Sequence, residues 1–178
     1  AWAGEAVTLD DEPENAIKVF PRPMQQPEPP IWVAAFGPKA LAQAGGLGLP
    51  YLSSPMESLG TLRENYAQHQ AAAVAAGVTP PEVVPLMRTV FVSRDAAQCK
   101  QLRESLATQA DNTRLQDGET IDDWTIIGEP SFVRERVQAY QQSLGMTHMI
   151  ATRIRLGGLQ EPVLRASVAL LAETLDEL

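Results

Sequence analysis

The 178-residue sequence predicts an α/β domain built on parallel strands that helices cover. Short, almost wholly apolar runs alternate along the chain with longer runs that carry apolar residues at helical spacing. Strands of a parallel sheet are typically continuous apolar runs, because helices bury both of their faces. Apolar residues make up 44% of the chain and charged residues 20%, which is enough for a sizeable core and excludes a disordered chain. We therefore expect one domain over residues 1–178.

Residues 1–30 precede the alternating pattern. A short apolar run at 16–20 leads into a segment that has five prolines between residues 21 and 30. Proline removes a backbone donor and fixes φ, so this segment is expected to be an extended connector. The 20 residues before it are too few for an independent domain. The prediction is a short strand followed by a proline-rich strap on the protein surface.

From Ile31 onward, the pattern predicts four strands and five helices. The strands are expected over residues 31–35, 50–54, 83–93 and 146–154, and the helices begin near Pro38, Pro55, Asp95, Pro130 and Pro162. Proline favours the first helical position, and Ser54 with Glu57 has the spacing of a capping box. Residues 111–125 are polar, acidic and unpatterned, and are expected to form an excursion, such as a lid or an insertion.

Strand-plus-helix units build either an open doubly wound sheet or a closed TIM-type (β/α)₈ barrel. The glycines at 44–48 follow a helix instead of opening one after a strand, so they are not a dinucleotide-binding fingerprint, and this disfavours the doubly wound alternative. A barrel takes eight units and about 250 residues. The four units predicted here amount to the parallel-strand half of such a barrel.

Composition excludes several classes of function. The net charge is −8 and no basic patch offsets it, so nucleic-acid binding is not expected. No apolar stretch approaches the roughly 20 residues of a membrane-spanning helix, and the acidic N-terminus is unlike a signal peptide. Cys99 is the only cysteine, which fits a reducing cytoplasm. It has no metal-ligand spacing with His69 or His148, so no metal is expected.

Five features then occur in a characteristic order. They are VFPRPMQQPEPPIWVAAFGPKALAQAGGLGLP at 19–50, Tyr66 in the next helix, RTVFVSRDAAQ at 88–98, IIGEPSFVRERVQAYQQSLGMTHMI at 126–150, and ATRIRLGGLQEPVLRASVALLAETL at 151–175. In this order and spacing the sequence resembles the bacterial luciferase-like family of flavin-dependent monooxygenases. Members of that family are (β/α)₈ barrels of about twice this length. The resemblance implies that this chain corresponds to barrel strands five to eight.

The resemblance also implies an activity and a cofactor. The complete enzyme would bind reduced FMN, react it with oxygen and pass one oxygen atom to a small organic substrate, while related barrels use a deazaflavin instead. The earlier half, which supplies most of the substrate pocket and usually the catalytic polar residues, is absent from this sequence, so no catalytic residue is assigned. An alternative from another class is a half-barrel that serves as a non-catalytic binding or assembly module.

Active sites of such barrels lie at the C-terminal ends of the strands, so the candidate residues follow the apolar runs. After the first run come Phe36, Gly37, Lys39 and Ala40. A glycine before a helix N-terminus allows close approach of an anion, and the resemblance implies that this loop holds the flavin phosphate. The alternative is an ordinary Gly-Pro helix start with a solvated lysine.

Two further candidates follow later runs. Ser53 ends the second strand and could contact the flavin ring, and Arg153 ends the fourth strand, where it could face an anionic cofactor or be a surface arginine. Arg88 starts its strand and is expected to be structural. His148, inside an apolar run, is expected to be a hydrogen-bonded core residue, and His69 a peripheral one.

Four units cut from a barrel would leave two unpaired sheet edges and an exposed apolar face. We therefore expect the chain to form a homodimer, to rearrange its strands, or to pair with the missing N-terminal half.

Overall fold

The computed structural model describes residues 4–8, 15–25, 29–110, 118–154, 156 and 158–176. The chain divides into two compact units, Ala1–Ile31 and Trp32–Leu178. In the first unit, Val7 and Ile17 form an isolated antiparallel bridge with two backbone hydrogen bonds of 2.9 Å. The expected strand at 16–20 is thus reduced to one bridged residue. The described part of the proline-rich segment carries neither helix nor strand.

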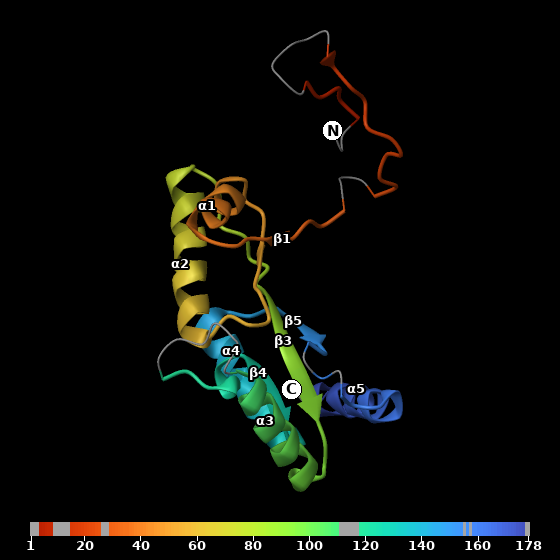
Figure 1. The fold of residues 1–178 in the computed structure, drawn as a ribbon. Coiled ribbons are helices and arrows are strands. Elements are labelled where there is room, and N and C mark those ends of the chain that lie inside the picture. Colours follow the sequence, from red (N-terminus) through yellow and green to blue (C-terminus); the bar gives the residue numbers. More distant parts are fainter. Residues whose placement is uncertain are drawn as a thin grey trace. The chain divides into compact units, whose positions relative to one another are not determined.

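Every named strand of the second unit pairs in parallel, as the sequence predicts. The strands are β1 (Val33–Ala34), β2 (Tyr51–Leu52), β3 (Pro85–Val92), β4 (Thr125–Gly128) and β5 (His148–Thr152). Strands β1 and β2 form one pair, and the other three form a sheet in the order β4-β3-β5. Strand β4 pairs with Thr89–Val92 and β5 pairs with Pro85–Thr89, so β3 is the central strand (Figure 1).

Five helices occur among the described residues, close to the expected positions. They are α1 (Pro38–Gly46), α2 (Leu59–Ala75), α3 (Ala96–Ala110), α4 (Pro130–Leu144) and α5 (Glu161–Leu175). Proline occupies the first turn of α1, α4 and α5, where its missing N–H leaves no intrahelical bond unmade. The second unit is therefore an α/β fold in which helices follow parallel strands.

Successive residues of β3 and β4 point into two different apolar clusters. Val90 and Ile126 belong to a cluster that includes residues of α1, α2, α4 and α5. Phe91 and Ile127, their neighbours in the chain, belong to a second cluster with residues of α3. Strand side chains alternate between faces, so β3 and β4 are buried on both sides. This explains why β3 reads as a continuous apolar run.

The sequence prediction of four strands is wrong, because β4 makes a fifth. Residues 111–117 of the expected excursion lie outside the described residues. From Gly118, the segment leads into a short 3-10 helix, Ile121–Asp123, which Thr120 caps in a reciprocal capping box with Asp123. Strand β4 follows at once and is buried at all four positions. Its four residues, next to a polar acidic stretch, give too short a pattern to distinguish from the start of α4.

Helix α2 begins four residues later than the sequence predicts. One of the two expected capping-box contacts exists: the Ser54 amide donates to Glu57 Oε2 at 2.7 Å, whereas Ser54 Oγ accepts from the Met56 amide, at 3.3 Å, in place of the Glu57 amide. They close a turn before the helix, however. Ser58 is the actual N-cap, and its Oγ accepts from the Thr61 amide at 3.2 Å.

Candidate functional site

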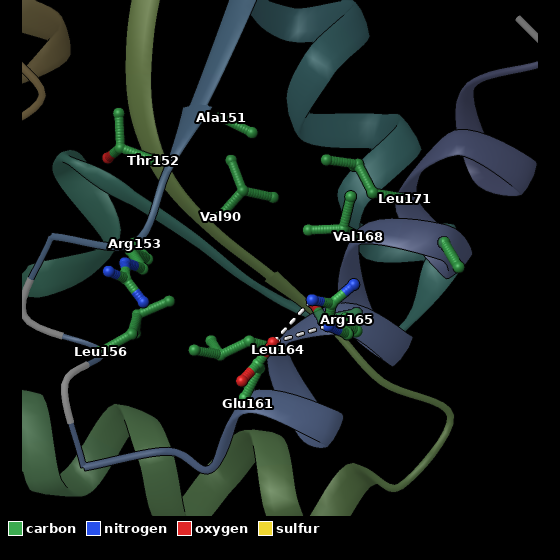
Figure 2. Close-up of a pocket in the computed structure, with 12 residues that line it drawn as sticks. Val90, Ala151, Thr152, Arg153, Leu156, Glu161, Leu164, Arg165, Val168 and Leu171 are labelled. Carbon is green, nitrogen blue, oxygen red and sulfur yellow. Dashed lines mark hydrogen bonds and ion pairs between the residues drawn. The ribbon is translucent and has the colours of Figure 1, made fainter.

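A cavity near the expected site face lies between β5 and α5 (Figure 2). Its volume is about 580 Å³, within the range of small-molecule sites. Twelve residues from β3, β5, the following loop and α5 line it: Val90, Ala151, Thr152, Arg153, Leu156, Glu161, Leu164, Arg165, Ser167, Val168, Ala169 and Leu171. The cavity thus borders the C-terminal end of β5.

Arg153 is the only sequence-predicted site residue that lines this cavity. Its side chain is exposed, and no carboxylate among the described residues pairs with it. Glu161 and Arg165 also line the cavity but are bonded to each other: Arg165 Nε and Nη2 donate to Glu161 Oε1 at 2.8 and 2.6 Å. Among the described residues that line the cavity, Arg153 is therefore the cation that has no carboxylate partner.

The loop before α1 has the geometry that anion binding at a helix N-terminus requires. Gly37 is the N-cap of α1, with φ of +88°, a conformation that favours glycine. A Cβ at Gly37 would have no neighbour within 4 Å, so the backbone is open to approach. The first-turn amides of Lys39 and Ala40 have no intrahelical acceptor. Phe36 is 72% exposed and Lys39 is also exposed, whereas Ala40 packs against the larger apolar cluster.

Ser53 lies in a different environment from the other candidates. It is only 2% exposed, and its Oγ accepts from the Met87 amide at 3.1 Å. This bond ties the end of β2 to the middle of β3. The side chain is thus engaged in the structure, and it lines neither the cavity nor the loop before α1.

Arg88 does not start its strand, as the sequence predicts, but lies inside β3, where it is wholly buried. Its Nε donates to the Tyr140 hydroxyl at 3.1 Å, and its Nη1 donates to the carbonyls of Met87 and Ser54 at 2.9 and 3.4 Å. Arg136 approaches the same phenol, with Nη2 3.5 Å from the hydroxyl. Two guanidinium groups therefore meet at one tyrosine, and Arg88 Nη2 and Arg136 Nε have no hydrogen-bond partner within the part of the chain that the structure describes.

The buried phenols nearby remain neutral. Burial raises the pKa of Tyr66, whose hydroxyl donates to the Pro85 carbonyl at 2.8 Å. Burial also raises the pKa of Tyr51, and its hydrogen bond to Glu57 Oε2, at 2.6 Å, adds to the shift. A phenol that ionises only at very high pH cannot act as a base near neutrality. The Tyr51 hydroxyl holds the loop after β2 in place, and the Tyr66 hydroxyl joins α2 to the start of β3.

Both histidine predictions are wrong. His69 is 4% exposed and its Nε2 lies 2.8 Å from the Leu49 carbonyl, so this nitrogen carries the proton. His148 is exposed, with Nδ1 2.9 Å from Thr147 Oγ1 and its ring 5.3 Å from that of Trp32. Among the described residues, no group of three His, Cys, Asp or Glu side chains could hold a metal ion. Nor is any described helix long and apolar enough to cross a membrane.

Parallel strands followed by helices are the arrangement of part of a (β/α) barrel, whose sites lie at the C-terminal ends of the strands. The chain belongs to the luciferase-like monooxygenase family, whose family model matches residues 1–148. The sequence-based recognition of the family is thus confirmed. No curated protein sequence matches the chain.

Solved structures show the same fold at low sequence identity. Monooxygenase RslO1 from Streptomyces bottropensis aligns with a TM-score of 0.69 and 20% identity, over 98% of this chain and 56% of its own. The oxygenating constituent of 3,6-diketocamphane monooxygenase from Pseudomonas putida, in complex with FMN, aligns at 0.66 and 16%, over 96% and 57%. An F420-dependent secondary alcohol dehydrogenase with an F420-acetone adduct aligns at 0.57 and 14%, over 94% and 56%. The chain therefore spans a little over half the length of these relatives, as a partial barrel.

Proposed function

We propose that this chain is the C-terminal half of a luciferase-like flavin-dependent monooxygenase, acting on a small organic substrate. Family membership over residues 1–148 is the observation that carries the proposal, and the FMN-bound relative supports it. When bound, reduced flavin supplies the reaction with oxygen and the transfer of one oxygen atom. The chain's own part is to bind, orient and shield that cofactor.

The loop before α1 is the proposed site for the cofactor's phosphate. Gly37 leaves the backbone open, and the amides of Lys39 and Ala40 point out of the helix N-terminus, where the helix dipole favours an anion. The exposed Lys39 ammonium adds a full positive charge. Phe36, which is largely exposed, offers a ring beside it.

The choice between FMN and a deazaflavin is left open by these residues. One similar structure holds FMN and another an F420 adduct. A helix N-terminus and a lysine recognise an anionic group without reading the ring system. We propose FMN first, because the family model and the two highest-scoring similarities above are monooxygenases.

Flavin titration of the isolated chain tests this proposal. Saturable FMN binding, followed by flavin fluorescence, is expected to weaken several-fold in Lys39→Gln and to be unchanged in Lys100→Gln, a matched exposed lysine on α3. Turnover is then measured with a flavin reductase and oxygen. Absence of binding at millimolar flavin, or equal binding by both variants, would overturn the phosphate site.

A non-catalytic binding or assembly module is the second candidate. One observation favours it: only Arg153, among the six predicted site residues, lines the cavity. Flavin binding without turnover, in the presence of the reductase, would support this alternative. A cytoplasmic location is part of either proposal, since the lone Cys99 is buried and needs no oxidising compartment.

Assembly through β5 is also proposed. Among the described residues this strand pairs only with β3, and its other edge is open. Three of its five residues are half-buried and two are exposed. An open edge can accept a further strand from a second copy or from an N-terminal half. Light scattering is expected to show a dimer, whereas a well-behaved monomer that binds no apolar dye would contradict the proposal.

A further inference from the structure

The cavity between β5 and α5 has an aliphatic wall. Its side chains include Val90 and Ala151 from the sheet and Leu164, Val168 and Leu171 from α5 (Figure 2). None of the twelve lining residues is aromatic, so no ring is present to stack on a flat heterocycle. Branched aliphatic side chains of this kind fit a flexible hydrocarbon chain, which gains by leaving water.

The hydroxyl groups of the wall are already used within the protein. Thr152 Oγ1 donates to the Arg88 carbonyl at 3.2 Å, and Ser167 Oγ accepts from the Val92 amide at 2.8 Å. Ser167 is 6% exposed. A polar ligand would therefore find few free partners inside the cavity and would lose its own hydration there. The interior of the cavity therefore favours the apolar part of a ligand.

The rim of the cavity carries one uncompensated positive charge. Arg153, Arg165 and Glu161 line it, two cations against one anion. The Arg165–Glu161 pair is internally bonded, and Figure 2 shows it near Leu164, whereas Arg153 lies beside Leu156. Arg153 is unpaired among the described residues. Its guanidinium can bind a carboxylate through two parallel N–H donors.

We propose that this cavity binds a small amphiphilic anion: a medium-length acyl chain that ends in a carboxylate. The hydrocarbon lies against the aliphatic wall, and the carboxylate meets Arg153 at the rim. This site is separate from the loop before α1 and does not depend on the proposed flavin chemistry. It assigns to Arg153 a ligand other than the flavin.

Displacement of a fluorescent fatty acid tests the site on the whole chain. Parinaric acid, whose fluorescence rises in apolar surroundings, is bound first, and monomeric decanoate is then added. Decanoate is expected to displace it saturably, 1-decanol to do so about five-fold more weakly because it lacks the charge, and FMN not at all. Displacement by FMN would assign the cavity to the cofactor and overturn the proposal.

Two variants separate the charge from the apolar wall. Arg153→Gln is expected to weaken decanoate about five-fold while leaving decanol unchanged, and Arg63→Gln, an exposed arginine on α2, serves as the matched control. Val168 is 66% exposed, so Val168→Asp should fold normally. Its carboxylate would repel the ligand and weaken decanoate at least about ten-fold.

Three results would overturn the inference. The first is decanoate binding that does not saturate. The second is an equal decanoate affinity in Arg153→Gln and the unchanged chain. The third is a probe fluorescence that changes with protein concentration in step with the molecular mass of the protein. The last would show that the cavity is covered by a second copy. Since flavin takes no part in these measurements, they can fail while the proposed oxidoreductase function stands, and the reverse also holds.

Discussion

The buried guanidinium of Arg88 donates to the hydroxyl of Tyr140 at 3.1 Å, with its Cζ 5.0 Å from the centre of the phenol ring. This contact joins the central strand β3 to α4. A second bond of Arg88, to the Ser54 carbonyl, joins β3 to the loop after β2. One side chain thus connects three elements, without any carboxylate bonded to it among the described residues.

Substitution of Arg88 is expected to reveal the cost of this uncompensated charge. Arg88→Lys keeps the charge but loses the fork that reaches Tyr140 and Ser54 together, and should lower the free energy of unfolding by about 3–5 kcal/mol. Arg88→Met removes the charge and keeps much of the volume, so it should cost less. Urea unfolding measures both variants. A larger loss in Arg88→Met than in Arg88→Lys would contradict this explanation.

Adjacent glycines of α1 are expected to respond in opposite directions to alanine. A Cβ at Gly45 would lie 2.3 Å from the backbone oxygen of His69, so Gly45→Ala must push α1 away from α2 and should cost about 1–3 kcal/mol. A Cβ at Gly46 would find its nearest neighbour at 3.8 Å, and Gly46→Ala should gain about 0.5–1 kcal/mol from helix propensity. Thermal unfolding compares them. Equal effects would mean that α1 and α2 are not in close contact.

The two histidines give a second matched pair. His69→Ala removes a buried ring and leaves the Leu49 carbonyl without its donor, which should cost about 2–4 kcal/mol. His148→Ala is a change at an exposed position, expected to stay within about 0.5 kcal/mol. Urea unfolding at one pH measures both. A larger loss at His148 would show that β5 is covered in solution.

The histidines also show what the sequence could and could not predict. His148 lies in an apolar run, and such a run predicts burial when the strand is central, as it does for β3. Strand β5 pairs on one side only, and pairing partners are a property of the whole fold that local pattern does not contain. His69 is expected to be peripheral from the Ala-rich sequence of its helix, and that composition gives no sign of how closely α1 approaches. That approach depends on Gly45, whose partner is 24 residues away.

The candidate site also has a part that the sequence could predict and a part that it could not. The loop 36–40 could be predicted, because a glycine and a proline before a helical pattern fix both the conformation and the helix start. The burial of Ser53 could not, since its partner is the Met87 amide on a strand that is distant in sequence. The cavity at Arg153 likewise requires α5 to lie against β3. The sequence could predict the local conformation of the loop, but it could not predict which residues from distant segments come together in space.

High pH is expected to destabilise the fold through Tyr51 and Tyr66. Burial raises the pKa of both phenols above the ordinary value of 10.0, so the unfolded chain loses these protons first. Stability from the two groups is therefore complete below pH 10 and falls as the pH rises above it.

The free energy of unfolding, measured in urea from pH 8 to 11, should decline more steeply in the unchanged chain than in Tyr66→Phe. The phenylalanine variant loses only the hydrogen bond to the Pro85 carbonyl, a cost of about 1 kcal/mol that does not depend on pH. Parallel curves for the two proteins would mean that the Tyr66 hydroxyl is open to water in solution.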